Sequence, residues 1–335
     1  MIEAAKTLRL VDSIPTLRRN ATRSKQYVRE SRSFLRREVD YRGVPLDVVA
    51  LGSIGRQEAS ASSDFDYLII AYGLPENVTA SRDLFAAVIE LRENKLHLGK
   101  QGPTNLFGRL VSAPDLIEFI GLEDDSNRSL THRMLILEEG VSLYRPDLHK
   151  TLIRKIIERY LADYSSPKPG VPRFLLNDIL RYWRTIAVDY QAKRWEDSEG
   201  WGLRYLKLRI SRKLAFAGSL VPLLLCRQNR EAKVQYFVDQ FSMPALARIA
   251  QLHTVKAFHK PLKTIFTIAE EFALKLSEAE FRDEAKSVKE PGDKTHWPPN
   301  FIKFNDRAND LQKALEQIFF ASNLFGKNSK KYLSF

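Results

Sequence analysis

Residues 52–66, which read G-S-I-G-R-Q-E-A-S-A-S-S-D-F-D, decide the fold of this chain. An apolar run at residues 48–51 leads into this stretch, and a second run at residues 67–70 leads out of it. Both runs have the length and the residue types of buried strands. The pattern therefore predicts two neighbouring strands joined by a turn that carries polar chemistry.

Two carboxylates, Asp64 and Asp66, close the stretch. Side chains alternate between the two faces of a strand, so these two point to the same face. Neighbouring carboxylates repel each other unless a cation bridges them, and hard oxygen ligands suit Mg²⁺ or Mn²⁺. The pair predicts a divalent metal site in which both residues are ligands and catalytic residues. A solvated hairpin is the alternative, but an unpaired acidic pair between two buried strands would be penalised.

Gly52 and Ser53 open the stretch. Glycine has no Cβ, so a ligand can approach the backbone closely there. The serine hydroxyl and the N–H groups of the turn can hold phosphate oxygens. We therefore expect this corner to hold a phosphate oxygen of a ligand.

The stretch as a whole resembles the signature of the nucleotidyltransferase superfamily with the DNA polymerase β-like fold. That signature is a G-S pair, an arginine three residues after the serine, and then S-D-x-D. The G-R-Q-E sequence at residues 55–58 is most similar to the bacterial uridylyltransferase-like branch. The matching residues are Gly52, Ser53, Arg56, Ser63, Asp64 and Asp66.

The resemblance implies that Gly52 and Ser53 hold the β- and γ-phosphates of a nucleoside triphosphate. It implies that Arg56 and Ser63 also belong to the nucleotide site, with Arg56 steadying either the turn or a phosphate. It implies transfer of a nucleoside monophosphate to an acceptor with release of pyrophosphate. In the resembling fold a third carboxylate often lies on the third strand. Here that strand is expected at residues 106–112, which contain no acid. Either a more distant acid acts, or the acceptor needs no strong base, or the protein binds nucleotide without turnover.

Composition limits the class of protein. The chain has 335 residues, is 44% hydrophobic and carries a net charge of +12, so it can bury a core and favours polyanionic partners. These partners are a nucleoside triphosphate, RNA or both, although a merely soluble basic protein fits as well; no DNA-specific motif is present. A single cysteine, Cys226, fits a reducing compartment. The absence of a targeting or membrane-spanning run predicts a cytoplasmic protein without membrane contact.

We expect an α+β fold with three parts. Residues 1–42 form a helical segment, broken before Pro15, that packs on the catalytic domain. Residues 43–145 form the nucleotidyltransferase-like domain, a small mixed sheet with flanking helices. Residues 146–335 form a mostly α-helical domain. The first segment is basic, with Arg29, Arg32, Arg36 and Arg37, and we favour a solvated helix that covers the sheet over a nucleic-acid contact.

Two helices of the C-terminal part, near residues 174–195 and 202–220, carry basic and aromatic side chains. They resemble the helical lobe that holds the triphosphate in the superfamily, which implies phosphate contacts for Lys207, Arg212 and Lys213. Ordinary salt bridges are the alternative. Glu138 and Glu139 are interpreted as a solvated helix end.

Three functions stay open at the level of sequence. The first is a metal-dependent nucleotidyltransferase that acts on a protein or an RNA, which the positive charge favours. The second is a small-molecule or second-messenger nucleotidyltransferase. The third is a catalytically silent nucleotide- or RNA-binding protein, which the missing third acid keeps open.

Overall fold

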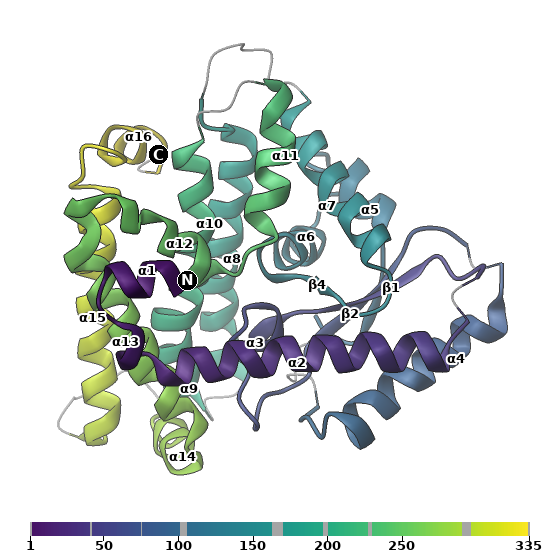
Figure 1. Ribbon diagram of the computed structural model, residues 1–335, viewed down its shortest axis with the longest axis horizontal. Coiled ribbons are helices and arrows are strands. Elements are labelled where there is room, and N and C mark those ends of the chain that lie inside the picture. The colour runs from purple at the N-terminus through teal and green to yellow at the C-terminus, as the bar shows by residue number, and fades with distance from the viewer. Residues whose placement is uncertain are drawn as a thin grey trace. The chain divides into compact units, whose positions relative to one another are not determined.

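The computed structural model describes residues 2–40, 42–74, 76–100, 106–162, 170–196, 200–226, 230–289 and 296–333. It confirms the α+β class, because a small mixed sheet near the N-terminus is followed by a mostly helical region (Figure 1). Most of the loop expected at residues 99–104 lies outside the described residues. No helix in the described ranges is long and apolar enough to cross a membrane.

The sheet has four strands in the order β3-β2-β1-β4. Strand β1 (Leu46–Ala50) pairs antiparallel with both β2 (Tyr67–Ala71) and β4 (Val141–Ser142), whereas β3 (Arg109–Ser112) runs parallel to β2. The sheet is therefore mixed. The two predicted strands around the signature are confirmed as a central antiparallel pair, in which Val48 lies opposite Ile69.

The N-terminal segment breaks where the proline predicted it. Helix α1 (Ile2–Thr7) and a 3₁₀ turn (Val11–Ser13) come first, and Pro15 then begins the long helix α2 (Pro15–Glu38). Proline suits this first helical position because its missing N–H would have no partner there. The break thus separates α1 from a straight 24-residue helix.

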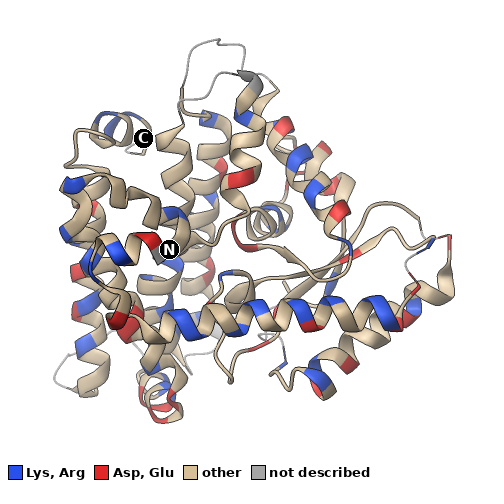
Figure 2. Cartoon of the chain, viewed as in Figure 1, with Lys and Arg blue, Asp and Glu red and all other residues tan. Residues whose placement is uncertain are grey.

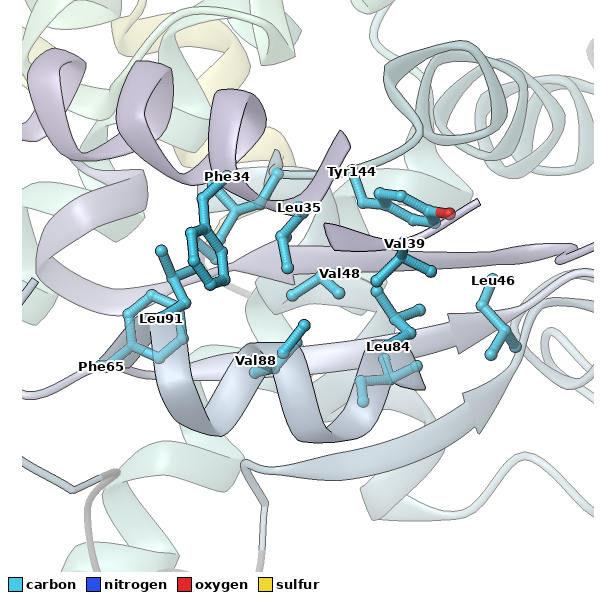
Figure 3. Packing of buried hydrophobic residues seen from close by; sticks show 14 of the residues in the cluster. Phe34, Leu35, Val39, Leu46, Val48, Phe65, Leu84, Val88, Leu91 and Tyr144 are labelled. Carbon is cyan, nitrogen blue, oxygen red and sulfur yellow. The ribbon is translucent and has the colours of Figure 1, made fainter. Parts of the chain in front are cut away.

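One face of the sheet is covered by α2 and by α4 (Val78–Glu90), which continues as a π-helical turn (Leu91–Lys95). Figure 3 shows Phe34 and Leu35 of α2 reaching toward Val48 of β1 and Val88 of α4. Phe34 and Leu35 therefore belong to the core that α2 forms with the sheet. Phe85 of α4, by contrast, is 39% exposed.

The remaining helices of the sheet region follow in order. They are α5 (Ala113–Glu118), α6 (Asn127–Glu139) and α7 (Pro146–Leu161). The C-terminal helices are α8 (Arg173–Glu196), α9 (Trp201–Lys207), a π-helical turn (Leu208–Arg212), α10 (Lys213–Leu225), α11 (Arg230–Phe241), α12 (Ala245–Ala250), α13 (His259–Ser277), α14 (Ala279–Ser287), α15 (Pro299–Phe319) and α16 (Gly326–Tyr332). Two 3₁₀ turns, Gln251–Thr254 and Lys256–Phe258, connect α12 to α13.

The chain divides into two compact units that interleave along the sequence. The sheet unit comprises Arg19–Asp178 and Arg227–Pro244, and the helical unit comprises Met1–Arg18, Ile179–Cys226 and Ala245–Phe335. The whole signature stretch lies in the sheet unit. The domain boundaries expected after residues 42 and 145 both fall inside this unit.

Candidate functional site

The glycine-serine corner is a single short helix, α3 (Gly52–Gly55), placed directly after β1. Gly52 has a φ of +60°, in the left-handed region that favours glycine. A Cβ built on Gly52 would lie 2.5 Å from Oδ2 of Asp66. The carboxylate of Asp66 therefore rests against the bare Cα of Gly52, and both the backbone angle and this close approach require a glycine.

The backbone beside β2 is held by its neighbours, so the two aspartates have defined positions. The N–H of Leu51 donates to the carbonyl of Asp66 at 2.9 Å, and the N–H of Phe65 donates to the carbonyl of Gly99 at 3.1 Å. Phe65 is fully buried in the core under α2 and α4. Because side chains alternate along extended backbone, Asp64 and Asp66 lie on the opposite face of the sheet from Phe65.

Asp64 and Asp66 differ in their surroundings. Asp64 is exposed and Asp66 is half-buried. A Cβ on Gly99 would meet Oδ1 of Asp64 at 2.7 Å, so a glycine backbone flanks this carboxylate, as Gly52 flanks that of Asp66. Across the described residues, no group of three or more His, Cys, Asp or Glu side chains is placed to hold a metal ion. A pair of carboxylates still fits Mg²⁺, which commonly takes one or two protein carboxylates together with phosphate oxygens and water.

Glu139 at the end of α6 fixes the corner. Its Oε1 accepts a hydrogen bond from the N–H of Gly52 at 3.0 Å, and its Oε2 accepts one from Nη1 of Arg56 at 2.6 Å. Nε of Arg56 donates to Glu58 at 2.9 Å. Burial works to lower the pKa of Arg56, but Glu139 and Glu58 outweigh it and raise the pKa above its ordinary value. In this structure Arg56 thus steadies the turn through two carboxylates.

The expectation of a solvated helix end at Glu138 and Glu139 is wrong. Both side chains are buried, with exposed fractions of 6% and 5%. Gly55 packs so tightly on this helix end that an added Cβ would lie 1.8 Å from the carbonyl oxygen of Glu139. One signal in the sequence pointed this way, because the two acids directly follow an apolar run at residues 134–137 that must be buried.

The two serines of the signature have different local roles. The hydroxyl of Ser63 accepts a hydrogen bond from the N–H of Ser60 at 2.9 Å, so it shapes the turn before Asp64. Ser53 is half-buried, and its carbonyl accepts from the N–H of Glu58 at 2.7 Å. Among the residues that the structure describes, the Ser53 hydroxyl makes no hydrogen bond. It is therefore the signature hydroxyl open to a ligand.

The third strand confirms the departure from the resembling pattern. Strand β3 runs parallel to β2 with Arg109 opposite Leu68, as a strand in the predicted region 106–112 should. Its four residues contain no acid. No carboxylate on β3 therefore joins Asp64 and Asp66.

Lys207, Arg212 and Lys213 lie in the helical unit, at the junction of α9, the π-helical turn and α10. Nζ of Lys213 donates to Gln312 at 2.7 Å, and burial, aided by the charge of Arg209, lowers the pKa of Lys213. Lys207 is exposed and Arg212 is half-buried. The predicted contact of these three residues with phosphate stays a prediction.

Comparison of the sequence with protein-family models and with curated proteins gives no match. The resemblance to the nucleotidyltransferase signature therefore depends on its six residues and on the mixed sheet that holds them.

Proposed function

We propose that this protein is a metal-dependent nucleotidyltransferase that moves a nucleoside monophosphate from a triphosphate to an acceptor and releases pyrophosphate. One observation carries the proposal: the Asp66 carboxylate rests against Gly52, so a metal ligand and the phosphate-accepting corner adjoin each other. The pairing of β1 with β2 brings the two residues together, because the register that sets Ala50 opposite Tyr67 leaves Gly52 next to Asp66. A metal ion held by Asp66 could therefore also bind an oxygen of a phosphate at the corner.

The reaction joins a nucleophilic oxygen of the acceptor to the α-phosphorus and breaks the bond from that phosphorus to the oxygen that bridges to the β-phosphate. Asp64 and Asp66 would hold Mg²⁺ or Mn²⁺, and the Ser53 hydroxyl would donate to a phosphate oxygen. When bound, the ion neutralises charge that develops on the phosphoryl oxygens, which is worth several kcal/mol. Glu139 and Arg56 would keep the corner in position without touching the nucleotide.

The acceptor we favour is a protein or an RNA, because the chain carries a net charge of +12. A small-molecule or second-messenger product is the alternative within the same chemistry. The acid-free strand β3 favours one further candidate, a protein that binds nucleotide or RNA without turnover.

The proposal predicts that Asp66→Ala lowers nucleotide transfer by at least ~1,000-fold, because each ~1.4 kcal/mol of lost transition-state stabilisation costs about tenfold in rate. The matched control is Asp83→Ala, which removes a half-exposed carboxylate of α4 that pairs only loosely, at 3.9 Å, with its neighbour Arg82. Circular dichroism checks that both variants are folded. An Asp66→Ala variant with a near-normal rate would remove Asp66 from the mechanism.

The assay incubates the protein with each labelled triphosphate, Mg²⁺ or Mn²⁺, and cell lysate. Label on protein or RNA supports the favoured acceptors, and a new soluble labelled compound supports a small-molecule product. Triphosphate binding that Asp66→Ala weakens, without any transfer of label, supports the silent binding protein.

A further inference from the structure

An open, shallow pocket of about 550 Å³ lies along α2 in the sheet unit. It is lined by four arginines and a serine: Arg29, Arg32, Ser33, Arg36 and Arg37. Figure 2 shows that Lys and Arg recur along this helix, with few acidic residues among them. We call the set Arg29, Arg32, Arg36 and Arg37 the arginine pocket.

Two of these arginines have no ion-pair or hydrogen-bond partner within the described residues. Arg37 forms an ion pair with Glu38 at 2.9 Å, and Nε of Arg32 donates to the carbonyl of Ser142 at 3.0 Å. Arg29 and Arg36 are exposed and make no ion pair or hydrogen bond with any residue in the described ranges. Four guanidinium groups, two of them unpaired, repel one another, so the pocket favours a polyanion.

The position of Arg32 is fixed by the fold. Its partner Ser142 belongs to β4, the edge strand of the sheet, and Arg32 covers a carbonyl at that edge. Burial lowers the pKa of Arg32, and the positive charge of Arg36 lowers it further. Ser142 follows Glu139 by three residues, so its Cα lies within about 11 Å of the Cα of the residue that holds the corner. The arginine pocket is therefore near the candidate site but distinct from it.

We propose that the arginine pocket binds the phosphodiester backbone of a nucleic-acid strand. Arg29, Arg32 and Arg36 follow the i, i+3, i+7 spacing, so they share one face of α2. A rise of 1.5 Å per residue spreads them over about 10 Å, which matches about three nucleotides of a strand with one charge per ~3.4 Å. A single phosphate could not reach all three.

Other polyanions fit less well. Binding to a lipid surface needs apolar anchors, whereas the lining of this pocket contains no apolar side chain. The planar guanidinium binds phosphate with two parallel hydrogen bonds, which favours arginine at a phosphate site. An acidic peptide would need three acidic side chains spaced to match the three arginines along α2. A backbone contact predicts similar affinity for RNA and DNA, because no base is read.

The test measures fluorescence anisotropy of a labelled 20-nucleotide oligouridine and of the matching oligothymidine, without triphosphate or metal. The double variant Arg29→Ala/Arg36→Ala is expected to lose at least ~10-fold in affinity for both strands. The slope of log affinity against log salt is expected to shrink by about 1.4, because two phosphate contacts are lost. The matched control is Arg82→Ala/Arg128→Ala, which removes the same charge from exposed positions of the sheet unit and is expected to change affinity less than ~3-fold.

Equal losses in the two double variants would overturn the proposal, since net charge alone would then explain binding. The absence of binding to either strand would also overturn it, as would binding of anionic vesicles or of a polyglutamate peptide in preference to both strands. The proposal does not depend on catalysis. Asp66→Ala is expected to keep full affinity for both strands, so failure of the transferase proposal and failure of this one are distinguishable.

Discussion

At the scale of single residues, the site depends on where a side chain is missing. Gly52 and Gly99 leave room for the carboxylates of Asp66 and Asp64, and Gly55 leaves room for the end of α6. Two of these glycines, Gly52 and Gly55, lie within the signature stretch at residues 52–66. Gly99 lies outside it, and its role follows only from the backbone hydrogen bonds that pair it with the segment around Asp64.

Gly52→Ala is expected to destabilise the protein by about 1–3 kcal/mol, because alanine at positive φ is strained and its Cβ would displace the Asp66 carboxylate. Metal-dependent transfer should fall with it. The control is Gly73→Ala, because a Cβ there meets nothing within 4 Å. Urea denaturation measures both variants, and equal stability of the two would contradict the strain argument.

A second residue-scale feature is the contact between buried Asp47 and half-buried His149, on the far side of β1 from the α2–α4 core. Oδ2 of Asp47 and Nδ1 of His149 lie 4.0 Å apart, and neither atom has a hydrogen-bond partner within the described residues. Burial raises the pKa of Asp47 to about 7. Hydrogen bonds from the N–H of Arg145 and the hydroxyl of Ser142 work to lower this pKa, but burial outweighs them. Burial also lowers the pKa of His149 to about 4.

These shifts predict a pH dependence. A carboxyl whose pKa is raised by folding contributes stability that is complete below the unfolded pKa and is lost as pH rises through about 7. The asparagine of Asp47→Asn cannot ionise, so this variant does not lose that stability. As pH rises from 5 to 8, the difference in free energy of unfolding between variant and wild type should shift by roughly 3 kcal/mol in favour of the variant. The His149 contribution is lost as pH falls from about 6.5 towards 4, and both proteins share it. Urea denaturation at several pH values tests this, and a constant difference across the range would contradict it.

At the scale of elements, α6 joins the corner to the rest of the sheet unit. Its last residue, Glu139, holds the corner, and Arg133 in its middle is completely buried. Arg133 donates to Asp125, to Asp178 at the start of α8 and to Tyr160 of α7. The sequence itself shows a run of apolar residues in this helix. It gave no sign of the ion pairs, because their partners are 8 and 45 residues away.

Arg133→Met is expected to lower the free energy of unfolding by about 3–5 kcal/mol, because it removes a buried guanidinium that pairs with two buried carboxylates. The matched control is Arg159→Met on the exposed side of α7, where a change of about 0.5 kcal/mol or less is expected. Thermal and urea unfolding compare the two variants. A small effect of Arg133→Met would show that Asp125 and Asp178 find other partners or are protonated.

At the scale of the whole molecule, the fold decides where part of the positive charge of the chain is concentrated. The net charge of +12 favours polyanionic partners but does not say where they bind. The preferred interpretation of α2 at the sequence level was a solvated helix that covers the sheet, and its apolar face does cover the sheet. Only the folded chain brings Arg32 to the edge strand β4 and leaves the open arginine pocket next to it.

The sequence by itself determined the two central strands, the glycine-serine corner between them, the break before Pro15, and the change from sheet to helix along the chain. These features are local, since alternation, helical periodicity and proline geometry act over a few residues. The tertiary structure alone decided that Glu139 holds Gly52 from 87 residues away, that Asp47 meets His149 in the interior, and that Arg32 reaches β4. Such contacts join distant segments of the chain, and no local pattern encodes which buried polar group will face which partner.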